Sequence, residues 1–277
     1  MDKLFLPKLL DWSIAILGLG YVGLPLAVEF ANKKICCRTK DKLDRKIIGF
    51  DTNLKRLKDL ENFNDRTGQI SKEILESTDN IFYTNDIKIL SEADVFIITV
   101  PTPIDKNKIP DLSFLESASS KVGEAINLKR RKKNSNHIAP VIIYESTVYP
   151  GTTEDFCIPI IEESSGLKHN NTKPDCSFFC GYSPERINPS DKVHTINSII
   201  KVTSGSNPTV AKWVDELYAS IIDAGTHLAP SIKVAEAAKV IENTQRDLNI
   251  ALINELSIIF DKMKLDTRDV LSAASTK

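Results

Sequence analysis

The sequence lacks the features that mark membrane proteins and nucleic-acid-binding proteins. None of its apolar runs approaches the ~20 residues that span a bilayer. The first residues contain no apolar core followed by a small-residue cleavage site. The formal net charge is −1, so no general basic field points to nucleic acid. We therefore expect a cytoplasmic protein that binds neither a membrane nor nucleic acid.

Cysteine and histidine are present without a disulfide or metal-binding pattern. None of the five cysteines forms a C-x-x-C pair, and no histidine lies at metal-ligand spacing from two of them. Without an export signal, we expect reduced thiols and no bound metal. The basic stretch at residues 129–133 is not interleaved with aromatic residues, which favours a solvated insertion over a nucleic-acid surface. Residues 33–46 are interpreted as a second polar, basic surface insertion.

The strongest signal is the sequence S-I-A-I-L-G-L-G-Y-V-G-L-P at residues 13–25. An apolar run of strand length precedes three glycines at G-x-G-x-x-G spacing, and an apolar helix start follows. Gly18 permits the tight turn, Gly20 lets a pyrophosphate approach the backbone, and Gly23 lets the helix pack closely on the strand. The helix N-terminus offers free N–H groups to phosphates. In this context the motif predicts a dinucleotide site, and a purely structural glycine turn is the alternative.

Polar residues follow other predicted strands, at the edge of a parallel sheet where ligands bind. Asp51 ends the second strand, where a carboxylate accepts ribose hydroxyls and disfavours the extra phosphate of NADP. A solvated loop aspartate is the alternative. Thr102 and Thr147 follow two buried strands, at residues 94–100 and 141–144.

An irregular loop is predicted at residues 181–191, with the sequence G-Y-S-P-E-R-I-N-P-S-D. It carries Glu185 and Arg186 side by side. Such loops often hold the residues that act on a substrate, although a surface ion pair is the alternative.

Residues 231–263 contain neither Gly nor Pro and carry apolar residues at helical spacing, which predicts one long helix that links domains or packs against a second copy. Lys239 and Asn243 lie four residues apart, hence on one face. A partly desolvated lysine beside an amide suits an anion or hydroxyl contact, and an ordinary solvated lysine is the alternative. The preceding strand–helix alternation predicts the α/β class. We expect a Rossmann-like, doubly wound, mostly parallel sheet in residues 1–229 and a connecting helix region in residues 230–277.

Together these segments resemble the UDP-glucose/GDP-mannose dehydrogenase family over residues 13–277. The matching segments are G-L-G-Y-V-G-L-P, I-G-F-D-T-N, I-T-V-P-T-P, Y-E-S-T-V-Y-P-G-T-T, G-Y-S-P-E-R-I-N-P and V-A-E-A-A-K-V-I-E-N-T-Q-R-D-L-N-I-A-L-I-N-E-L. The fourth and fifth are most similar to the branch that acts on UDP-N-acetylhexosamines in the synthesis of polysaccharide precursors. The family oxidises the C6 alcohol of a nucleotide sugar to a carboxylate with two NAD. The resemblance therefore implies NAD as cofactor and UDP-N-acetylglucosamine or a related UDP-sugar as substrate.

The resemblance also implies roles for individual residues. The residues implied to bind NAD are Gly18, Gly20, Tyr21, Val22, Gly23, Asp51, Arg56, Thr102 and Thr147. Glu185 is implied to handle the water that hydrolyses the acyl intermediate, and Thr147 to share the catalytic site beside the nicotinamide. Lys239 and Asn243 are implied to stabilise the developing oxyanion and, with Arg186, to contact the substrate. The helix at residues 231–263 is implied to form a homodimer interface.

The chain also departs from the family pattern. Family members carry a glycine-rich segment with the catalytic cysteine shortly after this helix, then a second α/β domain, and we expect this chain to stop before both. Because that thiolate is the nucleophile of the second oxidation, we expect NAD binding but little or no sugar oxidation from this chain alone. A smaller departure is Ser190, where the family usually has Gly.

Two other functions remain open. A β-hydroxyacid dehydrogenase also carries a long helix with Lys and, four residues on, Asn. Such enzymes usually have a glycine-rich turn before that Lys, which S-I-K-V-A-E-A-A-K lacks. The second is a non-catalytic, NAD-binding remnant that dimerises with a full-length relative.

Overall fold

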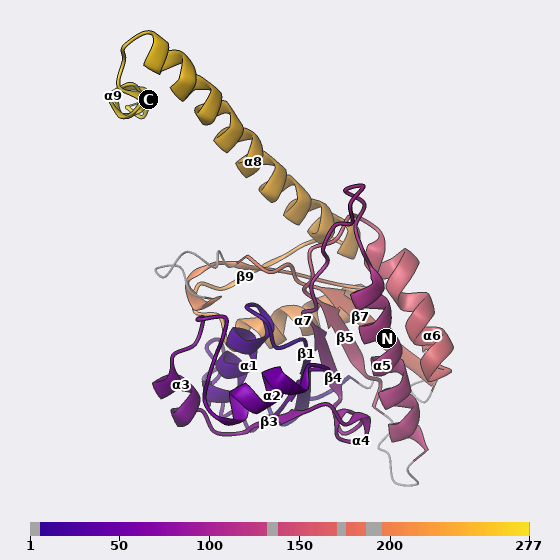
Figure 1. Cartoon of the computed structure of the whole chain (residues 1–277). Coiled ribbons are helices and arrows are strands. Elements are labelled where there is room, and N and C mark those ends of the chain that lie inside the picture. The colour runs from indigo at the N-terminus through magenta and orange to yellow at the C-terminus, as the bar shows by residue number, and fades with distance from the viewer. Residues whose placement is uncertain (1–5, 132–137, 171–175, 187–195, 277) are drawn as a thin grey trace. The chain divides into compact units, whose positions relative to one another are not determined.

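The computed structural model describes residues 6–131, 138–170, 176–186 and 196–276 (Figure 1). Two compact units divide the chain, Met1–Glu236 and Ala237–Lys277. The elements are β1 (Ser13–Leu17), α1 (Gly23–Asn32), β2 (Lys46–Phe50), α2 (Leu54–Glu61), α3 (Lys72–Ser77), β3 (Ile81–Thr84), α4 (Ile87–Leu90), β4 (Val95–Ile98), α5 (Ser113–Arg130), β5 (Val141–Tyr144), η1 (Thr152–Cys157), α6 (Ile158–Ser165), β6 (Lys168–His169), β7 (Ser177–Tyr182), η3 (Ile196–Ser198), β8 (Lys201–Gly205), α7 (Pro208–Ala219), β9 (Thr226–Leu228), α8 (Ile232–Lys262) and α9 (Thr267–Ala274).

The first unit is built on one mostly parallel sheet, with strand order β3-β2-β1-β4-β5-β7-β8-β9 and β6 beside β7. β7 and β8 pair antiparallel, whereas β1 to β5 pair in parallel. The register places Leu17 opposite Phe50 and Ile98 opposite Tyr144. These strands therefore end level with one another, and the loops that follow them meet at one edge of the sheet. This topology confirms the predicted Rossmann-like fold.

Helices cover both faces of the sheet and complete two hydrophobic clusters. Ile14 and Ile16 of β1 face the cluster to which α1 and α7 contribute. Ala15 and Leu17 face the opposite cluster, to which α5 and α6 contribute. Alternate residues of a strand point to opposite faces, so a strand covered on both sides is apolar throughout. This arrangement explains why the sequence of β1, β4 and β5 shows almost continuous apolar runs.

The start of η1 differs from what its residue types suggest. Thr152 is by residue type a plausible helix cap, but Gly151 precedes the π-helical turn η1, and Thr152 donates its hydroxyl to Tyr149 O. Instead the buried Glu236 carboxylate accepts the N–H groups of Gly151 and Thr153, at 2.6 and 2.9 Å, and the Thr153 hydroxyl at 2.7 Å. The cap therefore comes from a residue far along the chain. The short strands β6 and β9 were not predicted.

The stretch at residues 33–46 makes more contacts with the rest of the first unit than the predicted solvated insertion would. Arg45 is buried, and its guanidinium donates to Leu9 O and to Ser220 Oγ. Lys33 pairs with Asp223 at 3.1 Å. These contacts join the stretch to the end of α7. In the other basic stretch, residues 132 and 133 lie outside the described residues.

The predicted long helix is confirmed as α8, a single α-helix of 31 residues. The first unit ends at Glu236, within α8, and the rest of α8 forms the second unit together with α9. Within the described ranges, every helix is too short or too polar to span a bilayer.

Candidate cofactor site

The three glycines of the motif each have a separate structural reason. Gly18 has a φ of +93°, a conformation that other residues rarely adopt. A Cβ on Gly23 would lie 2.0 Å from Gly18 O and 2.4 Å from Thr99 Oγ1, so only glycine lets α1 approach β1 this closely. A Cβ on Gly20 would meet nothing within 4 Å, because Gly20 borders open space. The loop is therefore closed behind Gly23 and open at Gly20, where a pyrophosphate would approach.

Asp51 lies beside this loop, directly after β2. Its Oδ2 accepts the Leu19 N–H at 2.9 Å, and its Oδ1 accepts the Asn53 N–H at 2.8 Å. Asn53 in turn caps α2 by accepting the N–H groups of Lys55 and Arg56. Each carboxylate oxygen of Asp51 keeps a second lone pair, which suits the hydroxyls of a ribose. The carboxylate is thus fixed in orientation before any ligand binds.

The loops at this edge of the sheet enclose a cavity of about 510 Å³. Its lining residues are Gly18, Gly20, Tyr21, Val22, Asp51, Thr99, Val100, Pro101, Thr102, Pro103, Glu145, Ser146, Thr147 and Glu185. The cavity thus brings together eight residues that the sequence predicted: Gly18, Gly20, Tyr21, Val22, Asp51, Thr102, Thr147 and Glu185. Such a cavity, at the carboxyl ends of parallel strands, is the usual ligand site of this kind of sheet.

Other predicted residues lie elsewhere. Among the described residues, the lining does not include Gly23, Arg56 or Arg186. Arg186 donates to Ile200 O at 2.9 Å and borders a small hollow that Glu185 also lines. Lys239 and Asn243 lie one turn apart on α8, within the second unit. Their action on the substrate stays a prediction, as does the direct contact between Arg56 and the cofactor.

Hydrogen bonds between loops fix the far wall of the cavity. Thr102 Oγ1 donates to Thr147 O at 2.6 Å, and Ser146 Oγ donates to Val100 O at 2.5 Å. Tyr182 donates its phenol hydrogen to Ser146 O at 3.1 Å. The loops after β4 and β5 are therefore joined to each other and to β7. Because Thr102 donates its hydroxyl hydrogen to Thr147 O, its oxygen can only accept a hydrogen bond from a molecule in the cavity.

A buried ionic cluster behind Glu185 was not predicted. Lys201 Nζ donates to Glu145 Oε2 at 2.6 Å and to Pro184 O at 3.1 Å. Tyr218 donates to Glu145 Oε1 at 2.5 Å. Burial, together with the Glu145 charge, raises the pKa of Tyr218 well above its ordinary value, so this phenol stays a donor. The cluster supports the backbone that leads into Glu185, whose own N–H donates to Glu145 O at 3.3 Å.

The thiols of the chain lie away from this cavity. Burial raises the pKa of Cys157 to about 12 and that of Cys180 well above its ordinary value, so neither is a thiolate at neutral pH. The other thiols are Cys36, Cys37 and Cys176, and the cavity lining contains no cysteine among the described residues. The described part of the chain also holds no cluster of three or more side chains that could bind a metal ion.

Comparison with known proteins agrees with this site. Residues 12–222 match the UDP-glucose/GDP-mannose dehydrogenase family, NAD binding domain. Residues 233–277 match the central domain of the same family. The fold and the glycine loop fit this domain, whose cofactor is NAD.

Individual relatives extend the match over nearly the whole chain. The UDP-N-acetyl-D-glucosamine 6-dehydrogenase of Pseudomonas aeruginosa is 52% identical over 96% of this chain and 57% of its own length. The protein with the same name from Salmonella typhi is 49% identical over 96% of this chain and 56% of its own length. The structure of UDP-D-ManNAc dehydrogenase from Pyrococcus horikoshii matches with a TM-score of 0.79 at 28% identity, over 95% of this chain and 57% of that one. The chain thus spans little more than half the length of these relatives, and it belongs to the UDP-glucose/GDP-mannose dehydrogenase family.

Proposed function

We propose that this chain carries the cofactor half of a UDP-N-acetylglucosamine 6-dehydrogenase, which oxidises the C6 alcohol of a UDP-N-acetylhexosamine. The observation that carries the proposal is the cavity that joins the open glycine loop and Asp51 to the buried Glu185. The identity of 52% to a UDP-N-acetyl-D-glucosamine 6-dehydrogenase over 96% of the chain supports the choice of sugar. The reaction would supply a uronic acid for polysaccharide synthesis.

In this proposal, different residues bind different parts of the cofactor and the reacting water. NAD, when bound, accepts hydride from the alcohol carbon. Asp51 holds the adenosine ribose, and the loop at Gly20 holds the pyrophosphate. Thr102 and Thr147, joined by their hydrogen bond, line the nicotinamide side. Glu185, at the cavity wall, positions water for hydrolysis.

Three further residues enter the proposal from the family resemblance. Lys239 and Asn243 provide a cation and an amide donor for the oxygen on which negative charge develops. Arg186 contributes a guanidinium for the substrate. Arg186 Nη1 also donates to Ile200 O at 2.9 Å.

In the part of the chain that the structure describes, the cavity lining contains no thiol. The second oxidation needs a nucleophilic thiolate, and the buried Cys157 and Cys180 do not supply one. We therefore expect the 277 residues alone to bind NAD while producing little or no NADH from a UDP-sugar. A non-catalytic, NAD-binding protein is the second candidate function, and this placement of the thiols favours it.

We also propose a homodimer formed through α8. Ile241, Leu248, Leu252 and Ile259 recur along α8 at helical spacing, and their side chains are exposed in the structure. A second copy of the same helix offers a matching apolar face. Sedimentation should give a dimer for the wild type and a monomer for Leu248→Glu; a monomeric wild type would contradict the proposal.

Activity of the native protein, purified from its source, tests the proposed function. We expect NADH to form with NAD and UDP-N-acetylglucosamine, and Glu185→Gln to lower kcat by about 10²- to 10⁴-fold while NAD affinity is kept. The isolated 277 residues serve as the matched control and should form little NADH. Oxidation of a small 3-hydroxy acid in place of the UDP-sugar would favour a β-hydroxyacid dehydrogenase. Sustained NADH formation by the control would contradict the argument from the thiols.

A further inference from the structure

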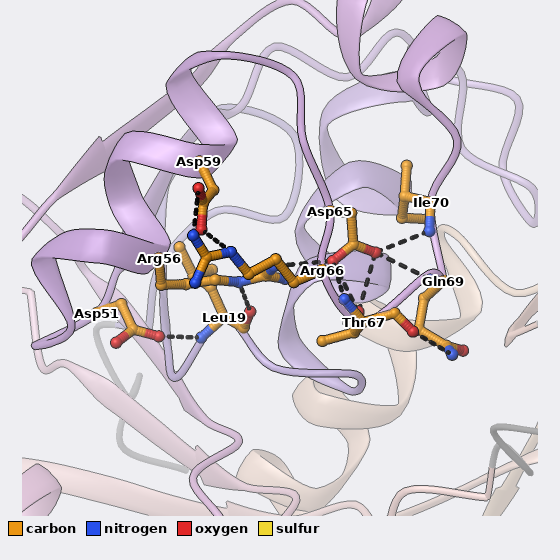
Figure 2. A network of polar contacts seen from close by, with 9 residues as sticks. All are labelled: Leu19, Asp51, Arg56, Asp59, Asp65, Arg66, Thr67, Gln69 and Ile70. Carbon is orange, nitrogen blue, oxygen red and sulfur yellow. Dashed lines mark hydrogen bonds and ion pairs between the residues drawn. The ribbon is translucent and has the colours of Figure 1, made fainter.

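Side chains from outside the glycine loop form hydrogen bonds with two of its peptide groups, Gly18–Leu19 and Leu19–Gly20. The Leu19 N–H donates to Asp51 Oδ2 at 2.9 Å, and Leu19 O accepts Arg56 Nε at 2.7 Å (Figure 2). Gly18 O accepts the Thr99 hydroxyl at 2.7 Å. No described peptide bond is cis. In a planar trans peptide the C=O and N–H point in opposite directions, so the N–H of Gly20 points away from Arg56.

Arg56 is itself held in place by a buried acid. Its Nη1 lies 2.8 Å from Asp65 Oδ1, and these side chains are 9% and 0% exposed. Its terminal nitrogens are inaccessible to solvent, so in this conformation they cannot touch a ligand. Figure 2 shows Arg56 reaching from Leu19 on one side to Asp65 on the other.

Asp65 is in turn fixed by its own loop. Its carboxylate accepts the N–H groups of Thr67, Gln69 and Ile70, and also the Thr67 hydroxyl. Burial alone would raise the pKa of this carboxyl. The donors of Ile70 and Thr67 and the Arg56 guanidinium outweigh that effect and lower it below its ordinary value. Asp65 therefore presents a charged, rigidly oriented acceptor to Arg56.

We propose that Arg56 and Asp65 are positioning residues for the cofactor, which hold the Leu19–Gly20 peptide so that the Gly20 N–H faces the pyrophosphate. Gly20 lines the cavity and borders open space. Among the described residues, its N–H donates to no acceptor. The inference rests on the proposed function, because it requires NAD in this cavity. It assigns Arg56 an action through Leu19 O, and it adds Asp65, which lies outside the glycine motif.

The chain offers a matched control for this pair. Arg66 and Asp59 form an ion pair beside the first one, with Arg66 Nη2 donating to Asp59 Oδ1 at 2.9 Å (Figure 2). The Arg66 side chain is 47% exposed. Arg66 is joined to Asp59, whereas the hydrogen bond to Leu19 O comes from Arg56. Breaking the control pair should therefore leave the glycine loop unchanged.

Calorimetric titration with NAD, ADP-ribose and adenosine tests the proposal on Arg56→Met, Asp65→Asn and the control Arg66→Met. We expect Arg56→Met and Asp65→Asn to weaken NAD and ADP-ribose about tenfold, the size expected for one charge-assisted hydrogen bond. Adenosine lacks the pyrophosphate, so its affinity should change by less than about twofold. Arg66→Met should bind all three ligands like the wild type.

Two further measurements keep the test decisive if Arg56→Met does not fold. Arg56→Lys retains one donor and should recover part of the NAD affinity. In NMR spectra, the chemical shift of the Gly20 amide should change when NAD binds to the wild type and should change much less in Asp65→Asn. Two outcomes would overturn the inference while the proposed function stands. One is that folded Arg56→Met and Asp65→Asn bind NAD as tightly as the wild type. The other is that these variants lose as much affinity for adenosine as for NAD. A wild type that does not bind NAD would overturn both the inference and the proposed function.

Discussion

Replacing Lys201 tests how much its ion pair with Glu145, in the buried cluster behind Glu185, contributes to the free energy of unfolding. The Lys201 side chain is 6% exposed and the Glu145 side chain 1% exposed. Lys201→Met keeps the apolar stem and leaves the Glu145 carboxylate buried, with Tyr218 as the side-chain donor that the described residues still offer it. Removal of one partner from a buried ion pair costs about 3–5 kcal/mol.

We therefore expect Lys201→Met to lower the free energy of unfolding by about 3–5 kcal/mol at neutral pH. Glu145→Gln combined with Lys201→Met should restore much of the stability, because no charge stays buried.

Urea unfolding followed by tryptophan fluorescence provides the assay. Both tryptophans, Trp12 and Trp213, lie in the first unit, so the signal reports on the unit that holds the cluster. Lys46→Met is the control, because the Lys46–Glu92 pair is exposed on both sides and should contribute at most about 1 kcal/mol. A loss below 1 kcal/mol in Lys201→Met, or a double variant less stable than the single one, would refute the reasoning.

Three other substitutions give separate predictions, each followed by urea unfolding. Gly23→Ala should destabilise the first unit by more than about 2 kcal/mol, because its Cβ would lie 2.0 Å from Gly18 O; wild-type stability would show that the loop can shift. Glu236→Ala leaves two buried N–H donors without acceptors and should cost about 2–5 kcal/mol, whereas a loss under 1 kcal/mol would mean that water replaces the carboxylate. Burial lowers the pKa of His169 to about 4 from 6.5, against an opposing pull from Glu162. Between these values the unfolded state binds the proton and the native state does not, so stability should fall as the pH falls through this window, by up to about 1.4 kcal/mol per pH unit. His169→Phe, which keeps a ring against Phe178, should flatten this dependence; an unchanged slope would assign it to other groups.

The sequence was most informative where the structural reason is local. The strand, glycines and helix of the motif follow one another directly, and the close contacts of Gly18 and Gly23 explain why those residues are required. Asp51 could be predicted because β1 and β2 pair in parallel and end level. The same logic placed Thr102 and Thr147 at one edge of the sheet.

The missed features depend on pairs that are distant in the sequence. Glu145 and Lys201 are 56 residues apart, and Glu236 and Gly151 are 85 apart. Which lysine meets which carboxylate depends on strand order and register, and no local pattern encodes either. Arg56 was expected at the cofactor, but the burial of its guanidinium against Asp65 follows from the loop after α2. The short strand β9 forms through pairing with β8 and not through its own composition.

Titration of NAD into the wild type and Gly20→Ala tests the central claim most directly. A Cβ at Gly20 has no protein neighbour within 4 Å, so the variant should unfold like the wild type within about 0.5 kcal/mol. The added methyl group would stand where the pyrophosphate approaches, so NAD affinity should fall at least about tenfold. Equal NAD affinity in the two proteins would place the dinucleotide elsewhere, and a wild type that does not bind NAD would contradict the account as a whole.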